Sequence, residues 1–453
     1  MPTTPQTQVI SQPLTLPCGK RLPNRLVKAP MEELLADFGG GLPNRLHHNL
    51  YNAWAKGGWG MIITGNVAID DTHLGTPFDV VLPKPPYLED LLESFRAYAD
   101  SVTGRSCGVQ ESNRPLAVVQ LVHAGRQSMR GSGRSVWQPA KAPSSVPMRP
   151  SDNLGIVGRA LDHFMWGTPK EMDLSDIQEV KLRYAQASRL CYLAGFDGVE
   201  LHASHGYLLA AFLSPKTNLR TDRYGGSNEN RARLLLEIVQ EVRNVVPPTF
   251  ALGVKLNSCD YVSGGLTEED ALLNVKWLAE TGGVDFIEIS GGNYENPSFI
   301  MDDFDSEAEK VKLGGGEKKK EDQQGAKGEH VNPVSSRTRK REAFFQSFAK
   351  RCRSVVPERR SEEGEQGGGG GIKLILTGGL RTRNGISGVI SSGDVDAAAL
   401  ARPAALYPDL ASRLTDPTIP DGDPRADTPA YKVPAIGGLS AVPLKLVGAG
   451  WGT

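Results

Sequence analysis

Short apolar strings recur along the chain, and longer segments with helical spacing of apolar residues follow most of them. The strings predict eight strands, and the segments between them predict helices. The predicted strands are Leu26–Pro30, Gly60–Thr64, Leu116–Leu121, Gly198–His202, Ala251–Leu256, Phe286–Ser290, Lys373–Thr377 and Ala397–Ala401. Predicted helices include Tyr87–Ala99, Leu174–Ala194, Asn230–Val245, Glu268–Thr281 and Arg341–Cys352. Alternating strands and helices favour a parallel sheet, and eight strands close a (β/α)8 TIM barrel.

An open, doubly wound sheet is the alternative α/β architecture. That fold would place a G-x-G-x-x-G loop after its first strand to bind a dinucleotide. Here the first predicted strand is followed by Pro30-Met31-Glu32-Glu33 instead. We therefore expect residues 1–453 to form a single barrel domain.

Several segments lie outside the barrel pattern. Leu14–Leu16, with the turn Pro17–Lys20, predicts an N-terminal hairpin that closes one end of the barrel. Gly131–Pro169 is rich in Pro and Ser and predicts a capping loop or hairpin over the active face. Residues 307–336 and 358–371 have too few apolar residues to offset the cost of ordering the chain, and they predict disordered insertions between strands six and seven. A basic recognition patch is the alternative for the lysine run, but glutamates interleave it.

Composition excludes several classes of protein. Lys and Arg number 51 against 52 Asp and Glu, which argues against a nucleic acid or a membrane surface as partner. The five cysteines are scattered without a C-x-x-C pair, so they indicate reduced thiols and supply no zinc or iron–sulfur ligands. The first thirty residues contain no long apolar run and predict no signal peptide or membrane span. We expect a cytoplasmic protein with a small-molecule substrate and no metal, and a homo-oligomer is compatible with the sequence.

Polar and glycine residues gather at one end of every predicted strand. In a barrel the carboxyl ends of the strands form the active site, so these residues should meet. Glycines after strands seven and eight, together with Arg402, suggest a phosphate site, although glycines also serve in simple tight turns. The strand ends carry Pro30-Met31-Glu32, Gly65-Asn66, Gln120, His202, Lys255, Ser290-Gly291-Gly292, Thr377-Gly378-Gly379 and Ala401-Arg402.

His202, His205 and Tyr207 stand close together where the fourth strand opens into its loop. Two imidazoles that converge on one oxygen can polarise a carbonyl or nitro group, and a nearby tyrosine can protonate carbon. Two other interpretations are open at this point. A histidine is often a satisfied core or surface group, and a histidine pair can bind metal, but no Asp, Glu or Cys accompanies these at a convincing spacing.

These residues resemble the Old Yellow Enzyme family of NAD(P)H:flavin oxidoreductases. The resemblance extends from about Leu14 to about Leu414, except for the two insertions. It implies noncovalent FMN at the carboxyl ends of the barrel strands, with NADPH or NADH as the transient hydride donor. The matching stretches are Asn24–Glu33, Trp54–Asp70, Gln120–Gln127, His202–Arg233, Gly291–Pro297 and Ala401–Leu410.

The resemblance also implies a role for each site residue. His202 and His205 would bind the carbonyl oxygen of an α,β-unsaturated substrate, and Tyr207 would protonate its α-carbon after hydride reaches the β-carbon. Lys255 would lie beside flavin N1 and O2, where the family more often has Arg. The isoalloxazine would contact Pro30, Met31, Gly65 and Gln120, and the phosphate would contact Gly378, Gly379, Ala401 and Arg402. NAD(P)H and the enone would use one pocket in turn.

Glu32 departs from the family pattern, which usually has Thr, Ser or Cys there, with its side chain reaching flavin O4. A carboxylate aimed at the flavin disfavours the reduced anion unless it is protonated or turned away. The favoured interpretation is that the turn shifts and Glu32 points elsewhere.

Three alternative functions remain. A relative with a fused second flavin domain and an iron–sulfur cluster would need cysteines and a nucleotide-binding domain that this sequence lacks. An oxidising or isomerising member would use the same residues. A non-catalytic flavin-binding protein is disfavoured by the unbroken set His202, His205 and Tyr207.

Overall fold

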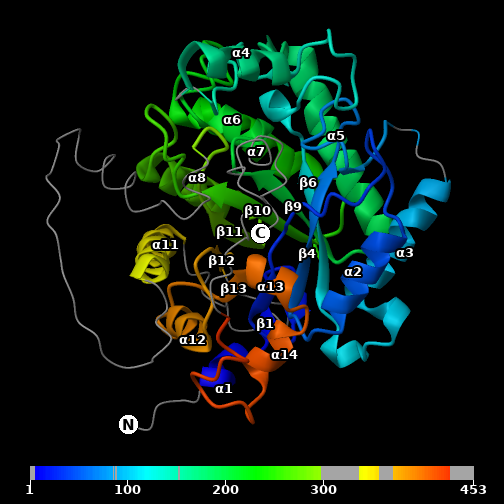
Figure 1. Cartoon of the computed structure of the whole chain (residues 1–453), viewed down its shortest axis with the longest axis vertical. Helices are drawn as coiled ribbons and strands as arrows, with labels where there is room; N and C mark the ends of the chain where they lie inside the picture. The colour runs from blue at the N-terminus through cyan, green and yellow to red at the C-terminus, as the bar shows by residue number, and fades with distance from the viewer. Residues whose placement is uncertain are drawn as a thin grey trace, which may run out of the picture.

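A closed ring of eight parallel strands forms the centre of the computed structural model (Figure 1). The structure describes residues 6–84, 86, 89–151, 154–296, 336–356 and 371–428, with the backbone alone for 336–345. Strand β13 pairs with β3, with Ala398 opposite Leu26, and this pairing closes the ring. The predicted TIM barrel is confirmed, and each predicted string overlaps one barrel strand. In ring order the strands are β3 (Leu26–Lys28), β4 (Met61–Ala68), β6 (Leu116–Val122), β9 (Gly198–Ala203), β10 (Ala251–Asn257), β11 (Phe286–Ser290), β12 (Lys373–Thr377) and β13 (Ala397–Leu400).

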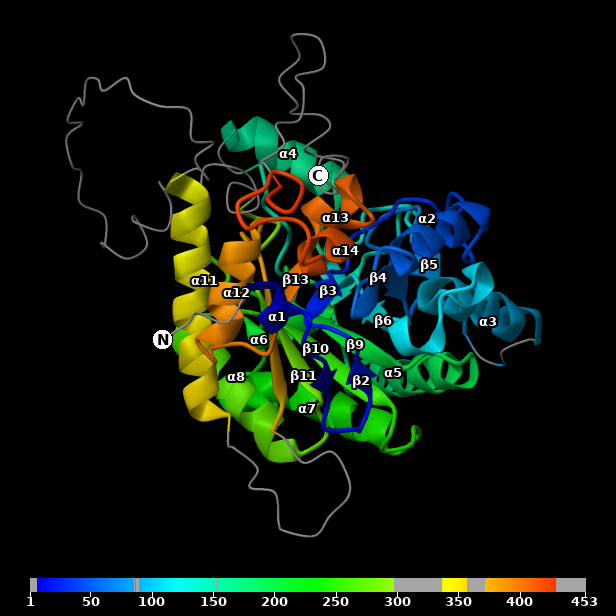
Figure 2. The ribbon, with the colours of Figure 1, turned by 90° about the horizontal axis from the view of Figure 1, so that it is seen from below.

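Helices surround the strands (Figures 1 and 2). Side chains cap the amino-terminal ends of several of these helices. Asp173 and Thr267 each accept a hydrogen bond from the third backbone N–H of the following helix. The long helices are α2 (Arg45–Ala55), α3 (Glu89–Thr103), α5 (Leu174–Leu193), α7 (Asn228–Arg243), α8 (Glu268–Thr281), α11 (Ser336–Val355) and α12 (Arg383–Ser391). Shorter helices are α1 (Gln6–Ile10), α6 (Leu208–Leu213), α13 (Arg402–Leu406) and α14 (Leu410–Thr415).

Successive side chains along each strand point alternately out of and into the barrel, so the hydrophobic core has two layers. Side chains that point outward pack under the helices, and those that point inward fill the barrel near the starts of the strands. The Phe286 ring packs directly on Gly253 of the neighbouring strand. A Cβ atom at Gly253 would lie within 2.1 Å of this ring, so only glycine leaves room for it. A fully buried Phe stabilises the fold by about 1.5–3 kcal/mol, so Gly253→Ala would break this layer.

The predicted N-terminal hairpin is present. Strands β1 (Leu14–Thr15) and β2 (Arg21–Leu22) pair antiparallel. Leu14, Leu16 and Leu22 pack against Met61 and Leu116, which begin their strands. The hairpin therefore fills the amino-terminal end of the barrel and leaves the carboxyl ends of the strands for the site.

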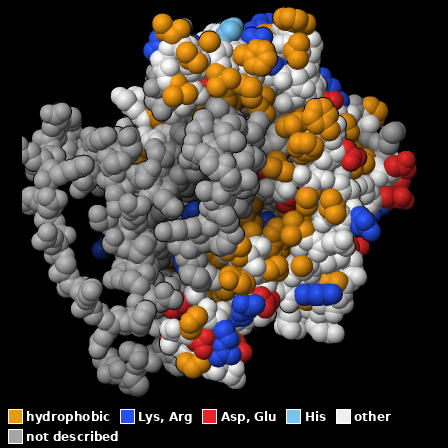
Figure 3. All heavy atoms as spheres, in the orientation of Figure 1, with side chains coloured by type: hydrophobic (Ala, Val, Ile, Leu, Met, Phe, Trp, Pro, Cys, Tyr) orange, Lys and Arg blue, Asp and Glu red, His pale blue; other side chains and the backbone are white. Residues whose placement is uncertain are grey.

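The excursion after β6 is built differently from the predicted hairpin. Strands β7 (Lys141–Ala142) and β8 (Lys170–Glu171) pair in parallel, because α4 (Gly155–Met165) carries the chain across between them. Trp166 anchors the excursion by donating from Nε1 to the Gln127 carbonyl, 2.9 Å away. Helix α4 exposes apolar side chains at its outer face, where Figure 3 shows a gathering of them.

The two predicted disordered insertions lie outside the described residues, except for their last residues, Ser336 and Gly371. Within the described ranges, no helix has the length and apolar character needed to cross a membrane.

Candidate active site

A pocket opens at the carboxyl ends of the barrel strands. It is lined by all but one of the residues to which the family resemblance gave a role, and its lining residues together come from every barrel strand or the loop after it. The lining residues include Pro30, Met31, Glu32, Asn66, Gln120, His202, His205, Tyr207, Lys255, Ser290, Tyr294, Gly378, Gly379, Arg381, Ala401 and Arg402.

Gly65 is the predicted residue that does not line the pocket. Its N–H donates to Glu33 Oε1 at 2.9 Å and to the Tyr51 hydroxyl at 2.8 Å, behind the pocket wall. A Cβ atom at Gly65 would lie 2.2 Å from the Met31 carbonyl oxygen. Glycine is therefore needed for the close approach of β4 to the loop after β3. The next residue, Asn66, faces the pocket instead.

The structure brings His202, His205 and Tyr207 together. The His202 ring centroid lies 5.1 Å from that of His205 and 4.7 Å from that of Tyr207, both edge to face. Burial holds the pKa of His202 well below its usual range and lowers the pKa of His205 to about 3, and the charge of Lys255 adds to both shifts. Both imidazoles are therefore neutral near neutral pH and can each donate one N–H to a carbonyl oxygen.

Local hydrogen bonds aim both rings. The Ser204 N–H donates to His202 Nδ1 at 3.4 Å, which leaves the His202 proton on Nε2. His205 has a left-handed backbone with φ of 59°, which is unusual outside glycine. Its backbone N–H donates to Asn257 Oδ1 (3.1 Å) and its carbonyl accepts from Gln127 Nε2 (2.6 Å), which fixes the loop, and its ring Nε2 lies 3.0 Å from Ser290 Oγ.

Charged side chains lie beneath the pocket, inside the barrel. Lys255 Nζ pairs with Glu288 Oε1 at 2.8 Å, and both side chains are almost fully buried. Burial and the nearby Glu288 raise the pKa of Glu200 well above its usual range. Burial also acts to raise the pKa of Glu288, but Lys255 and hydrogen bonds outweigh it, and that pKa is lowered. Glu200 therefore holds a proton, while Glu288 offsets the charge of Lys255.

The loops after β12 and β13 form the opposite rim of the pocket. Gly378 and Gly379 have φ of 118° and 77°, conformations that glycine adopts readily. Arg381 and Arg402 line the same part of the pocket. Glycine N–H groups beside two guanidinium groups form a suitable cradle for a phosphate.

Comparison with known proteins identifies the family. Residues 10–298 match the model of the NADH:flavin oxidoreductase / NADH oxidase family. The chain belongs to this family. An NADH-dependent flavin oxidoreductase, iliE, from Hypocrea jecorina is 36% identical over 94% of this chain and 93% of its own length. Its namesake from a Neonectria species is 39% identical over 91% of this chain, which spans 49% of that longer protein.

Solved structures share the fold at lower identity. Morphinone reductase in complex with tetrahydroNAD superposes with a TM-score of 0.63 and 22% identity, over 90% of this chain and 93% of that one. An Old Yellow Enzyme homologue from Zymomonas mobilis gives a TM-score of 0.63 at 20% identity, over 89% and 91% of the two chains. The solved structures show the shared barrel fold, and the family model and the relatives confirm the predicted family: the protein is an oxidoreductase that uses flavin and a nicotinamide.

Glu32, the departure from the family pattern, faces the pocket. Its Oε1 accepts hydrogen bonds from the Tyr207 hydroxyl and from Asn66 Nδ2, the latter at 2.7 Å. The interpretation in which the turn carries Glu32 away therefore does not hold. The segment after β3 is held by Glu33, whose side chain points to Tyr51 and Gly65, and this leaves the preceding carboxyl group to the pocket.

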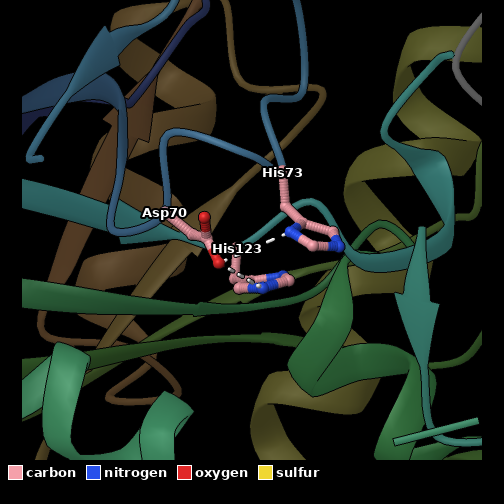
Figure 4. A group of neighbouring side chains, drawn as sticks. All are labelled: Asp70, His73 and His123. Atoms are coloured by element: carbon pink, nitrogen blue, oxygen red, sulfur yellow. Dashed lines mark ion pairs between the residues drawn. The ribbon is translucent and has the colours of Figure 1, made fainter. Parts of the chain in front are cut away.

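Asp70, His73 and His123 form a second buried cluster, beside the pocket loops (Figure 4). Their spacing would suit a metal ion, but the ring nitrogens that face away from Asp70 accept backbone N–H groups: His73 Nε2 from Lys141 (3.0 Å) and His123 Nδ1 from Gly125 (3.0 Å). The ring N–H groups therefore face the Asp70 carboxylate. Burial also lowers the pKa of His73 to about 4. These interactions therefore hold the loop after β4 against the segments that contain His123 and Lys141, without a metal.

Sequence reasoning missed some site residues. Glu200 and Glu288 could have been found, because each is a charged residue inside an otherwise apolar strand. Arg381 lies two residues after Gly379, and its charge near the proposed phosphate glycines could have indicated it. Tyr294 lines the pocket from the loop after β11, and Asp79 lies near the Tyr207 hydroxyl in the loop after β4; no local pattern indicates either position.

Proposed function

We propose that the protein binds FMN in this pocket and reduces the activated C=C bond of an α,β-unsaturated carbonyl compound with NAD(P)H. The neutral pair His202 and His205 beside Tyr207 carries the proposal, because together they provide carbonyl recognition and a proton donor.

The residues around the pocket fit FMN. Gly378, Gly379, Arg381 and Arg402 would hold the phosphate. Lys255 would lie near the pyrimidine edge of the ring system, and Met31 and Gln120 would contact its surface. Bound FMN supplies the hydride, which it receives from the nicotinamide.

The protein side chains perform the remaining chemistry. N–H groups of His202 and His205 bind the carbonyl oxygen and stabilise the enolate that forms when hydride reaches the β-carbon. The Tyr207 O–H bond then breaks as the proton moves to the α-carbon. Lining residues such as Pro30, Met31 and Ala401 limit water around the reacting atoms.

The test is the visible spectrum of the purified protein under anaerobic conditions, first with NADPH or NADH and then with 2-cyclohexenone. We expect a yellow protein that bleaches with a nicotinamide and recovers its colour with the enone. Tyr207→Phe should bleach at the normal rate and recover about a hundredfold or more slowly, because it has lost its proton donor. Tyr192→Phe, a change in an exposed tyrosine on α5, is the control and should behave as the wild type.

Two results would overturn the proposal. A protein that cannot take up added FMN would remove the cofactor assignment. A flavin-loaded protein that bleaches but is not reoxidised by any enone would indicate an oxidising or isomerising reaction instead.

A further inference from the structure

The Tyr207 hydroxyl has a carboxyl partner. It donates to Glu32 Oε1, and the Tyr294 hydroxyl lies 3.2 Å from Tyr207 and 3.5 Å from the same carboxylate oxygen. Asn66 Nδ2 donates to Glu32 at 2.7 Å and lies 3.3 Å from the Tyr207 hydroxyl. Glu32 therefore lies at the centre of a hydrogen-bonded group that includes the proposed proton donor.

A second carboxyl group lies near the same hydroxyl. A Cβ atom at Gly75 would lie 3.2 Å from Asp79 Oδ2 and 3.4 Å from the Tyr207 hydroxyl, so these two atoms border one small space. Asp79 is 4% exposed and accepts from the Gly75 N–H at 2.8 Å. The cluster of Asp70, His73 and His123 holds the loop that brings Asp79 here.

These surroundings keep a proton on the acidic pair. Burial raises the pKa of Glu32, and the neighbouring Glu33 adds to the shift, against hydrogen bonds from Tyr207, Tyr294 and Asn66. Burial and the charge of Glu32 raise the pKa of Asp79 to about 7. Two such groups around one small space cannot both ionise easily.

The state of Glu32 decides whether Tyr207 can act as an acid. Burial and the charge of Glu32 raise the pKa of Tyr207 well above its usual range. A tyrosinate left beside an ionised Glu32 would place two negative charges in contact. If Glu32 carries a proton, loss of the Tyr207 proton leaves one negative charge at this position instead of two.

We propose that Glu32 is a proton-relay residue that acts through Tyr207. This inference rests on the proposed function. When Glu32 is protonated, its O–H donates to the Tyr207 oxygen in the reverse of the hydrogen bond described above. As the Tyr207 O–H bond breaks and a C–H bond forms at the substrate α-carbon, the Glu32 O–H bond breaks and restores the Tyr207 hydroxyl. The negative charge of the enolate ends on the Glu32 carboxylate, which Asn66 stabilises, and a solvent proton later returns to it. Glu32 positions and supplies the proton, and Tyr207 remains the catalytic residue.

The first experiment follows the recovery of flavin colour with 2-cyclohexenone against pH, in wild type, Glu32→Gln, Glu32→Asp and Glu33→Gln. We expect the wild-type rate to fall as pH rises through the titration of Glu32. Glu32→Gln should be at least about tenfold slower at low pH and show no such step, and Glu32→Asp should restore it in part. Glu33→Gln should keep the step and move it to lower pH, because it removes a charge that raises the pKa of Glu32. A Glu32→Gln variant with the wild-type pH step would overturn the relay.

The second experiment does not depend on turnover. Protein labelled with ¹³C at glutamate Cδ is titrated by NMR, and the Glu32 signal is assigned by its loss in Glu32→Asp. We expect its midpoint to lie above that of an ordinary glutamate and to rise further in Tyr207→Phe, because the hydroxyl stabilises the carboxylate. A midpoint near the usual value of about 4.3 that does not respond to Tyr207→Phe would overturn the relay. If the enone fails to reoxidise even the wild type, the proposed function fails, and this titration alone decides whether the two groups share a proton.

Discussion

Lys255 and Glu288 form a buried ion pair of 2.8 Å directly below the pocket, with β10 and β11 placing the two residues side by side. The cation proposed to lie near the flavin is therefore offset by a carboxylate that the sequence analysis did not anticipate. Its effective charge toward the flavin is smaller than that of an unpaired lysine.

Removing the Glu288 charge should stabilise the reduced, anionic flavin. We expect Glu288→Gln to raise the midpoint potential of bound FMN by on the order of 30 mV, which is a tenfold change for a two-electron couple. Equilibration with a reference dye measures it. Glu280→Gln, a change in a half-exposed glutamate on α8, should leave the potential unchanged. An unchanged or lower potential in Glu288→Gln would show that Lys255 does not act on the flavin.

The glycine at position 65 should be required for packing. Gly65→Ala should lower the free energy of unfolding by about 1–3 kcal/mol, because its methyl group would overlap the Met31 carbonyl oxygen. Displacement of the segment after β3 should also weaken FMN binding. Thermal melts and flavin fluorescence measure the two effects. Gly388→Ala is the matched control: its site in α12 is open, so alanine should be neutral or stabilising.

Asp79 should make the protein less stable at high pH. Its folded pKa, about 7, lies above its unfolded value of 3.8, so its contribution is fully present below pH 3.8 and is lost as pH rises through 7. At about 1.4 kcal/mol per pKa unit, the loss is a few kcal/mol. Asp79→Asn should therefore be more stable relative to wild type at pH 8 than at pH 5. Urea melts at both values test this, and the exposed Asp37→Asn should show no such difference.

The two arginines on the pocket rim should distinguish FMN from riboflavin. A charge-assisted hydrogen bond contributes about 1.5–3 kcal/mol, so Arg381→Ala or Arg402→Ala should weaken FMN binding roughly 10- to 100-fold. Riboflavin, which lacks the phosphate, should bind each variant as it binds wild type. Equal losses for both ligands would mean that the arginines support the pocket rather than bind the phosphate.

The sequence predicted the features that depend mainly on residues close together along the chain. Short apolar strings located the barrel strands, and closure of the barrel then brought distant strand ends together, so His202, Lys255 and Gly378 could be assigned to one pocket from the sequence. Gly65, which the family resemblance assigned to the flavin, does not line the pocket, whereas Asn66 does, and the register of β4 against β6 shifts between Ile63 and Asn66. A one-residue shift exchanges the faces of a strand, and apolar periodicity does not reveal it.

Loop conformation was the part that sequence reasoning could not supply. The direction of Glu32 depends on Glu33, which binds Tyr51 and Gly65 from distant segments. The excursion after β6 was expected as a loop or hairpin, but α4 allows its two short strands to run in parallel. Such outcomes are decided by tertiary contacts, for which Pro and Ser content carries no signal.

Closure of the ring through β3 and β13 has a consequence for biosynthesis. The first barrel strand to leave the ribosome stays unpaired on one edge until the last one, near residue 400, has been made. The proposed phosphate site includes residues after β12 and β13, so a nascent chain has no complete site for its cofactor until β13 has been made. Flavin loading should therefore follow synthesis of β13, and a truncation before β13 should leave both an open sheet edge and an apoprotein.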